Sequence, residues 1–269
     1  MITLIVAIAA GCGAFAGTFW GLDFGWGWSV FCGVVGFGAC QVVLGLLVQK
    51  RLKRDMEGVQ GILLAGQKRT QEKVQRWQIR PPGSLQAAKN ELFGDTKVFV
   101  SEAIAKTSVL EKYRPWVPLF ERQLATIRLQ LYWMIRDWRN VDALMPKVVL
   151  LDPTVSAMKM ARMFMLEKPT DEIRKVYEKA AGRVKYNGNV LLAATMSWIQ
   201  VRRDDADGAF KTLTAALKKS DNETLKRNHE LLMNNRVAHF NNSGIGDPWY
   251  SLQLEEPKVK AQRQRSVFR

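Results

Sequence analysis

The side chains that most often do chemistry are few in this sequence of 269 residues. The two histidines, His229 and His239, are ten positions apart, a spacing that does not place them on one helical face. All three cysteines, Cys12, Cys32 and Cys40, lie in the nearly uncharged first 49 residues, away from any partner ligands. No pattern here is typical of a metal centre, and we expect neither a metal nor a cofactor.

Three acidic residues gather at Asp204, Asp205 and Asp207. The surrounding loop lacks the ligand pattern of a calcium-binding loop, so we interpret these residues as a solvated turn with helix N-cap acids. Residues 50–269 contain no phosphate-binding glycine loop and no nucleophile elbow. We therefore expect that the chain is not an enzyme.

Charged residues divide the chain sharply, although its mean hydropathy of −0.14 is that of an ordinary soluble protein. Residues 1–49 contain one charged side chain, Asp23, and the rest carries all 40 Lys and Arg and 24 of the 25 acids, a net charge of +16. Residues 50–83 hold nine basic and three acidic residues, and 257–269 hold five basic residues and no acid. This composition excludes a wholly soluble chain and a disordered one.

Two apolar runs, residues 1–22 and 24–48, are each long enough to cross about 30 Å of hydrocarbon as a helix. Asp23 separates them among glycines and large aromatic residues, which are typical of a turn at the lipid–water interface. The sequence predicts a transmembrane helical hairpin over residues 1–49. Asp23 is interpreted as a loop acid, with an intramembrane ion relay as the alternative.

Basic residues directly follow the second run, and the turn between the runs has none. The positive-inside rule then predicts two spans of the cell (inner) membrane with both termini in the cytoplasm. We expect the basic residues at the end of the second span to contact lipid headgroups. They are Lys50, Arg51, Lys53 and Arg54.

Small residues recur at every fourth position of the hairpin, at Gly13, Gly17, Gly21 and Gly25, and Gly36 belongs to a similar stripe on the second run. Such stripes let helices approach closely. Two interpretations stay open. The stripes pack the two helices against each other, or they form a seam with other membrane subunits.

From residue 50 onward the apolar spacing is helical, and the sequence predicts an all-α fold. A basic juxtamembrane helix ends at the Pro-rich boundary Arg80-Pro81-Pro82-Gly83. Residues 84–111 read as a helix interrupted near Gly94-Asp95. Seven helix-length runs follow, at 119–138, 140–151, 154–167, 170–184, 190–202, 205–219 and 223–240. The expected domains are 1–49, 50–83, 84–251 and a basic tail, 252–269.

The second helix of successive pairs repeats at spacings of 32 and 36 residues. Met145, Val148 and Pro153 correspond to Tyr177, Ala180 and Lys185, and these to Leu213, Ala216 and Asp221. The segment Tyr132–Leu144, followed by Leu150-Leu151-Asp152-Pro153, resembles the tetratricopeptide (TPR) repeat, whose period is 34 residues. Small residues stand where that family has them at Ala161, Ser197 and Ala209, whereas Leu129, Lys185 and Gln200 depart from its pattern.

The resemblance covers residues 120–222 and implies a TPR-like superhelix of antiparallel helix pairs, capped by 223–251. It also implies a concave groove, lined by first helices, that holds a peptide or a partner helix. Mapped onto this chain, the groove includes Gln130, Trp133, Trp198 and Arg202, which we expect to bind the partner. The alternative is that both tryptophans are buried between helices.

Together these features predict a membrane-anchored adaptor that assembles protein partners at the cytoplasmic face, as part of a homo- or hetero-oligomeric complex. The alternative is a structural membrane subunit whose glycine-striped hairpin packs against larger partners. The basic tail is expected to lie on lipid or to bind an acidic partner. No motif that reads nucleic acid accompanies it, so we do not expect nucleic-acid binding.

Overall fold

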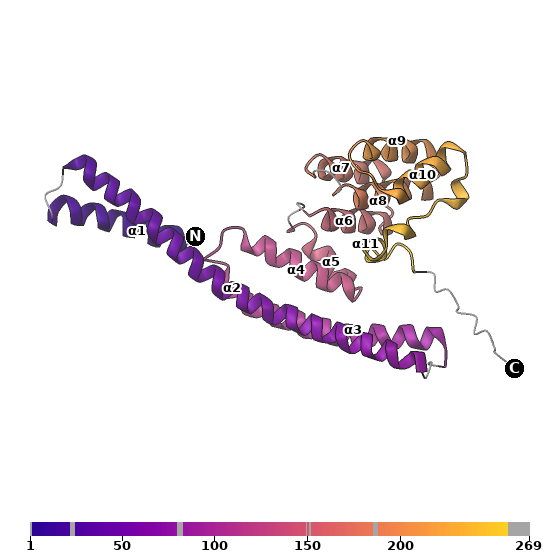
Figure 1. Cartoon of the computed structure of the whole chain (residues 1–269), viewed down its shortest axis with the longest axis horizontal. Coiled ribbons are helices and arrows are strands. Elements are labelled where there is room, and N and C mark those ends of the chain that lie inside the picture. Colours follow the sequence, from indigo (N-terminus) through magenta and orange to yellow (C-terminus); the bar gives the residue numbers. More distant parts are fainter. Residues whose placement is uncertain are drawn as a thin grey trace. The chain divides into compact units, whose positions relative to one another are not determined.

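The computed structural model describes residues 2–21, 25–79, 83–148, 150, 152–184 and 188–257. Every regular element in these residues is a helix, which confirms the all-α prediction (Figure 1). The chain forms two compact units, Met1–Val148 and Val149–Arg269. Asp23, the dipeptide Pro81-Pro82, Lys185 and the basic residues of the tail lie outside the described residues.

The first unit begins with an apolar helical hairpin. Helix α1 (Ile2–Ala16) continues through one π-helical turn (Gly17–Gly21) and packs against the first half of α2 (Trp26–Ile79). Both helices are long and apolar enough to cross a membrane, judged by length and composition. Large apolar side chains point outward on both, and Trp20 and Trp26 are 78% and 71% exposed. An extended exposed apolar surface of this kind is typical of a surface that contacts lipid or another protein.

Helix α2 runs without a break for 54 residues, so no helix end marks the domain boundary expected at residue 50. Its charged half pairs with α3 (Leu85–Lys106), which Ser84 caps by accepting a hydrogen bond from the N–H of Ala87. Figure 1 shows the two helices side by side. At Gly66 of α2 a Cβ would overlap the ring of Phe99, so glycine is what allows this close pairing.

The interruption expected near Gly94-Asp95 is wrong, because α3 continues through both residues. One glycine inside a helix costs only about 1 kcal/mol relative to alanine. Asp95 and Glu91 pair with Lys73 of α2, which fixes α3 along its partner at this point. Tertiary pairing therefore overrides the local helix-breaking signal.

A 3₁₀ segment (Thr107–Tyr113), α4 (Phe120–Met134) and α5 (Trp138–Leu144) complete the first unit. Helix α5 is shorter than the run 140–151 suggested, because a turn begins at Met145. The core gathers side chains from α2, α3, the 3₁₀ segment and α4. Its buried members are Val59, Val100, Ala103, Leu110, Tyr113, Phe120, Leu124 and Leu131.

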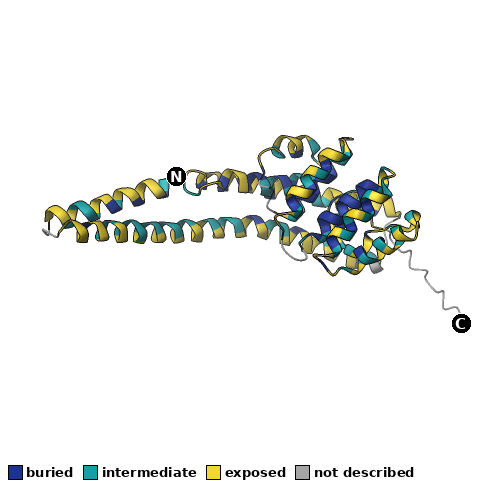
Figure 2. Ribbon diagram, turned by 90° about the horizontal axis from the view of Figure 1, so that it is seen from above, coloured by how far each residue is buried: buried dark blue, intermediate teal, exposed yellow. Residues whose placement is uncertain are grey.

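The second unit consists of α6 (Pro153–Met165), α7 (Thr170–Ala181), α8 (Val190–Arg202), α9 (Ala206–Leu217), α10 (Glu223–Met233) and α11 (Asp247–Tyr250). Helix α8 is central, since it packs against α6, α7, α9 and α11, and its residues from Leu191 to Gln200 are all buried. Figure 2 shows the buried positions concentrated on the inner helices. Ala161, Ser197 and Ala209, the small residues noted in the sequence, are all buried.

The same turn ends four helices. Helices α4, α6, α8 and α10 each end in a residue with left-handed backbone geometry, and their first residues are 33, 37 and 33 positions apart. After each such residue, the next N–H bonds back to a carbonyl of the preceding helix at 2.8–3.0 Å, which is a Schellman cap. The left-handed residues are Arg136, Glu167, Asp204 and Asn235. The chain thus has a structural repeat close to 34 residues, independent of its apolar pattern.

Candidate partner-binding and membrane sites

Trp198 and Arg202 of α8 are engaged by the C-terminal segment of the same chain. The indole N–H of Trp198 donates to Oε1 of Glu255 at 2.7 Å, and the indole of Trp249 donates to Oε2 at 3.0 Å. Arg202 pairs with Glu255 at 3.3 Å and lies 5.0 Å above the Trp198 ring. Trp198 is only 5% exposed. It is therefore a buried residue, as in the alternative interpretation of the sequence.

Gln130 and Trp133 belong to the first unit. Trp133 is 1% exposed and contacts Trp138 edge-on, with ring centroids 5.1 Å apart. Gln130 is half-buried on α4. Trp133 therefore acts as a core residue, and Gln130 is the sequence-predicted groove residue that keeps a partly open position in this unit.

The hairpin helices pack through a set of small residues that is largely different from the predicted one. A Cβ at Gly11 would lie 2.9 Å from Cβ of Phe37, and a Cβ at Gly36 would lie 2.9 Å from Cβ of Ala14. Gly33 is similarly close to Phe15. The two helices therefore pack most closely at glycines, which have no side chain to hold them apart.

Of the predicted glycines, only Gly36 lies in that contact. Among the described residues, and apart from the local backbone of the same helix, no atom lies within 4 Å of the position that a Cβ would take at Gly13, Gly17, Gly21 or Gly25. Ala7 and Gly11 share the same four-residue spacing and are buried, so periodicity alone does not reveal which face of α1 packs.

The four basic residues Lys50, Arg51, Lys53 and Arg54 follow the apolar half of α2 directly, and all are exposed. The next residue, Asp55, accepts a hydrogen bond from the Tyr113 hydroxyl and pairs with Lys112, each at 2.7 Å. Hydrogen bonds from Lys112 and then Tyr113 lower the pKa of the Asp55 carboxyl below its usual range. Asp55 therefore stays ionised and holds the 3₁₀ segment against α2.

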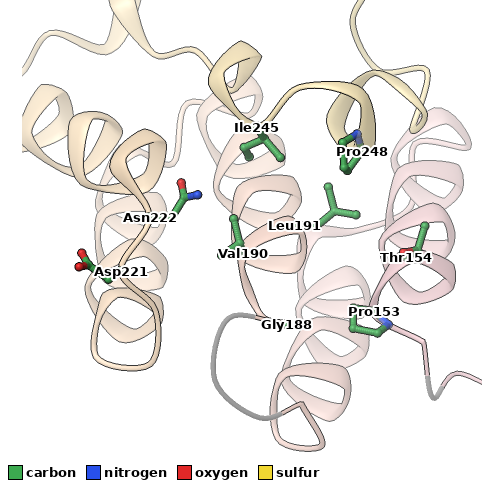
Figure 3. Close-up of a pocket in the computed structure, with 9 residues that line it drawn as sticks. All are labelled: Pro153, Thr154, Gly188, Val190, Leu191, Asp221, Asn222, Ile245 and Pro248. Carbon is green, nitrogen blue, oxygen red and sulfur yellow. The ribbon is translucent and has the colours of Figure 1, made fainter.

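The second unit has a hollow of about 430 Å³ where α6, α8 and α10 begin (Figure 3). Val190, Leu191, Ile245 and Pro248 give it an apolar lining. Two of its polar side chains are already engaged, because Asn222 caps α10 and the neighbouring Asp221 pairs with Lys226. The hollow is therefore suited to an apolar side chain.

Two of the residues first considered for chemistry, His229 and Asp205, have structural contacts. His229 stacks on Phe210 at 4.4 Å, and its Nε2 lies 3.0 Å from the Thr214 hydroxyl. Asp205 caps α9 by accepting a hydrogen bond from the N–H of Gly208, as the sequence predicted. Among the described residues, no three His, Cys, Asp or Glu side chains are grouped so that they could hold a metal ion.

No protein-family model, curated protein or solved structure matches this chain. Inferences about its function rest on its own residues and their geometry.

Proposed function

We propose that this chain is a membrane-anchored helical-repeat adaptor that binds and assembles protein partners at the cytoplasmic face of the membrane. The observation that carries the proposal is the repeated Schellman turn at the ends of α4, α6, α8 and α10. Helix pairs joined by one repeated turn and spaced about 34 residues apart are the architecture of TPR-like superhelices, which serve as binding scaffolds.

The anchor is the apolar hairpin. In this proposal α1 and the apolar half of α2 cross the inner membrane, and the basic residues Lys50, Arg51, Lys53 and Arg54 place their end at the cytoplasmic headgroups. Both termini are then cytoplasmic. Confining the repeat units to a surface raises the effective concentration of whatever they bind.

An intramolecular contact on α8 supports one kind of partner chemistry. Glu255 shows that a carboxylate fits between the Trp198 indole and the Arg202 guanidinium, with charge-assisted hydrogen bonding. An acidic side chain of a partner would satisfy the same donors if the C-terminal segment moved aside. The proposal therefore favours partners with an acidic residue next to apolar ones.

A second function is favoured by the glycines of α1. Gly13, Gly17 and Gly21 recur at four-residue spacing on α1 and its π-helical turn, and no neighbouring helix in the described part of the chain packs against them, although the hairpin already packs through Gly11, Gly33 and Gly36. An unoccupied stripe of small residues suits close approach by another transmembrane helix. The alternative is therefore a structural subunit of an integral membrane complex.

Affinity purification from native membranes separates the two functions. The full chain is compared with a fragment that begins at residue 50. This fragment keeps the charged half of α2 paired with α3, whereas a fragment that begins at residue 84 would lack the helix on which α3 packs. The adaptor proposal expects the fragment to retain the partners of the full chain. Loss of all partners with the hairpin would overturn it in favour of the membrane subunit.

A Gly17→Leu variant tests the alternative function, that of a membrane subunit, directly. Gly45→Leu is a matched control because its position is equally open. If the hairpin is the working part, Gly17→Leu releases partners and Gly45→Leu does not. Retention of the partners by both variants supports the adaptor.

A further inference from the structure

A pocket of about 440 Å³ lies beside α2 where its apolar half ends. All of its lining belongs to the first unit, and its size is within the range of small-molecule sites. Helix α2 supplies one wall, and the segment around Tyr113 supplies the other. The lining residues are Leu44, Leu47, Val48, Arg51, Arg54, Lys112, Tyr113 and Trp116.

The pocket changes character along the helix. Its α2 residues are three or four positions apart, or adjacent, so they share one helical face. Leu44, Leu47 and Val48 come first, and Arg51 and Arg54 follow. The rise from Leu44 to Arg54 is about 15 Å. One end of the pocket is thus apolar and the other is cationic, as in a site for a molecule with a hydrocarbon chain and an anionic head.

The cationic end carries excess positive charge. Lys112 is paired with Asp55 at 2.7 Å, and this contact fixes the lysine at the pocket wall. Arg51 and Arg54 make no ion pair with any acidic residue in the described part of the chain. Arg51, Arg54 and Lys112 thus carry three positive charges, and the one carboxylate paired with them is that of Asp55. The two guanidinium groups remain able to bind an anion through paired N–H donors.

The wall opposite α2 is held in place by the beginning of α1. The N–H of Ile2 donates to the carbonyl of Pro115 at 2.9 Å, and the hydroxyl of Thr3 donates to the carbonyl of Trp116 at 3.1 Å. Tyr113 is 5% exposed and packs edge-on against Phe120. The first turn of α1 therefore supports the wall that faces the end of the apolar half of α2. A preformed wall lowers the entropic cost of binding.

We propose that this pocket binds one molecule of an anionic glycerophospholipid. The phosphate lies between Arg51, Arg54 and Lys112, and an acyl chain lies along Leu44, Leu47 and Val48. Trp116 is half-buried at the rim, where amphipathic aromatic side chains favour the lipid–water interface. This proposal rests on the membrane insertion proposed above and is independent of partner binding by the repeats.

The chain offers a matched control for the general attraction between basic residues and anionic membranes. Lys50 and Lys53 belong to the same helical segment and are equally exposed, but they do not line the pocket. Arg51→Gln with Arg54→Gln removes two charges from the pocket, and Lys50→Gln with Lys53→Gln removes two from beside it. If the attraction is diffuse, both double variants lower the affinity for anionic lipid. If the pocket is the binding site, only the arginine double variant lowers it.

The test is native mass spectrometry of the full chain in detergent, titrated with phosphatidylglycerol, phosphatidylcholine or soluble glycerol phosphate. We expect one phosphatidylglycerol to bind in preference to phosphatidylcholine. The arginine double variant should weaken that first binding event about 30-fold, and the lysine double variant should change it less than about threefold. Glycerol phosphate should not compete, because it lacks the acyl chain.

Three results would overturn the proposal. They are equal losses in the two double variants, equal affinity for both lipids, and competition by glycerol phosphate at matched concentration, which would indicate a site for free phosphate. Circular dichroism checks that the arginine variant is folded, and Lys112→Gln, which should also weaken binding, tests the opposite wall. Resistance to alkaline extraction from vesicles tests insertion separately, so the lipid site can fail while the membrane anchor stands.

Discussion

The indole N–H of Trp198 is hydrogen-bonded at 2.7 Å to Glu255, a residue 57 positions further along the chain. The second oxygen of the same carboxylate accepts a hydrogen bond from the completely buried Trp249. One acidic side chain near the end of the described residues thus serves two indole donors and closes the C-terminal segment over α8.

Glu255→Ala should therefore destabilise the second unit. A buried donor without an acceptor costs about 1–3 kcal/mol, so we expect the free energy of unfolding to fall by about 2 kcal/mol or more. The measurement is guanidinium unfolding of the full chain in detergent, followed by tryptophan fluorescence. Glu255→Gln keeps an acceptor oxygen and should lose less than Glu255→Ala. Glu230→Ala, at an exposed position, should stay within about 0.5 kcal/mol, and an equal loss there would contradict the assigned role.

Two buried asparagines tie α10 and the segment after it to α8. Nδ2 of Asn228 donates to Oδ1 of Asn242 at 2.7 Å, and Nδ2 of Asn242 donates to the carbonyl of Ala194 at 3.0 Å. We expect Asn228→Ala and Asn242→Ala each to cost about 1–3 kcal/mol of unfolding free energy. In a double-mutant cycle the two changes should be coupled by at least about 0.5 kcal/mol. Strict additivity would mean that the two side chains act separately.

The hairpin contacts predict opposite effects for two small substitutions. At Gly36 an added methyl group would lie 2.9 Å from Ala14, so Gly36→Ala should lower the thermal stability of the hairpin, by about 1 kcal/mol or more. At Gly13 the space is open, and Gly13→Ala should be neutral or stabilise by up to about 1 kcal/mol through helix propensity. Melting of the full chain in detergent, followed by circular dichroism, measures both. Equal destabilisation would contradict the open position assigned to Gly13.

Because of the contact of Asp55 with Lys112 and Tyr113, we expect the stability of the folded chain to decrease at low pH. The pKa of Asp55 is lowered in the folded chain, so its stabilising effect is complete above the ordinary carboxyl pKa near 3.9 and is lost as the pH falls through the lowered value. We expect melting temperatures to decrease below about pH 4. Asp55→Asn should reduce the melting temperature at pH 7 and flatten that decrease. A decrease of the same size in the variant would assign the acid sensitivity to other carboxylates.

Much of the helical arrangement could be predicted because its signals are local. The predicted run 190–202 coincides with α8, and the acids beside Gly208 cap a helix as their type and position indicate. The signal at Gly94-Asp95 was also local, but it was overridden by the pairing of Asp95 with Lys73, 22 residues away in sequence. Local patterns identify helices well, and they fail where tertiary contacts stabilise a weak segment.

The candidate sites were less predictable, because they depend on which surfaces meet. The sequence places Trp198 on a face typical of a groove, and nothing near it indicates that Glu255 returns to cover it. The four-residue spacing of Gly13 and Gly17 is shared by Ala7 and Gly11, so the packed face of α1 cannot be chosen from periodicity. Likewise, the basic residues after the hairpin look equivalent in sequence. The fold separates Arg51 and Arg54, which line a pocket, from Lys50 and Lys53, which do not.

The unbroken helix α2 has a mechanical consequence. Its charged part, from Gln49 to Ile79, is about 45 Å long at the ordinary rise per residue. In the membrane orientation proposed above, this part, with α3 packed along it, would act as a lever arm that pivots at the membrane surface. Transmembrane helices tilt as bilayer thickness changes, and a tilt of about 10° would swing the far end through about 8 Å. A chain built in this way would convert the thickness of its lipid surroundings into the position of its α2–α3 tip.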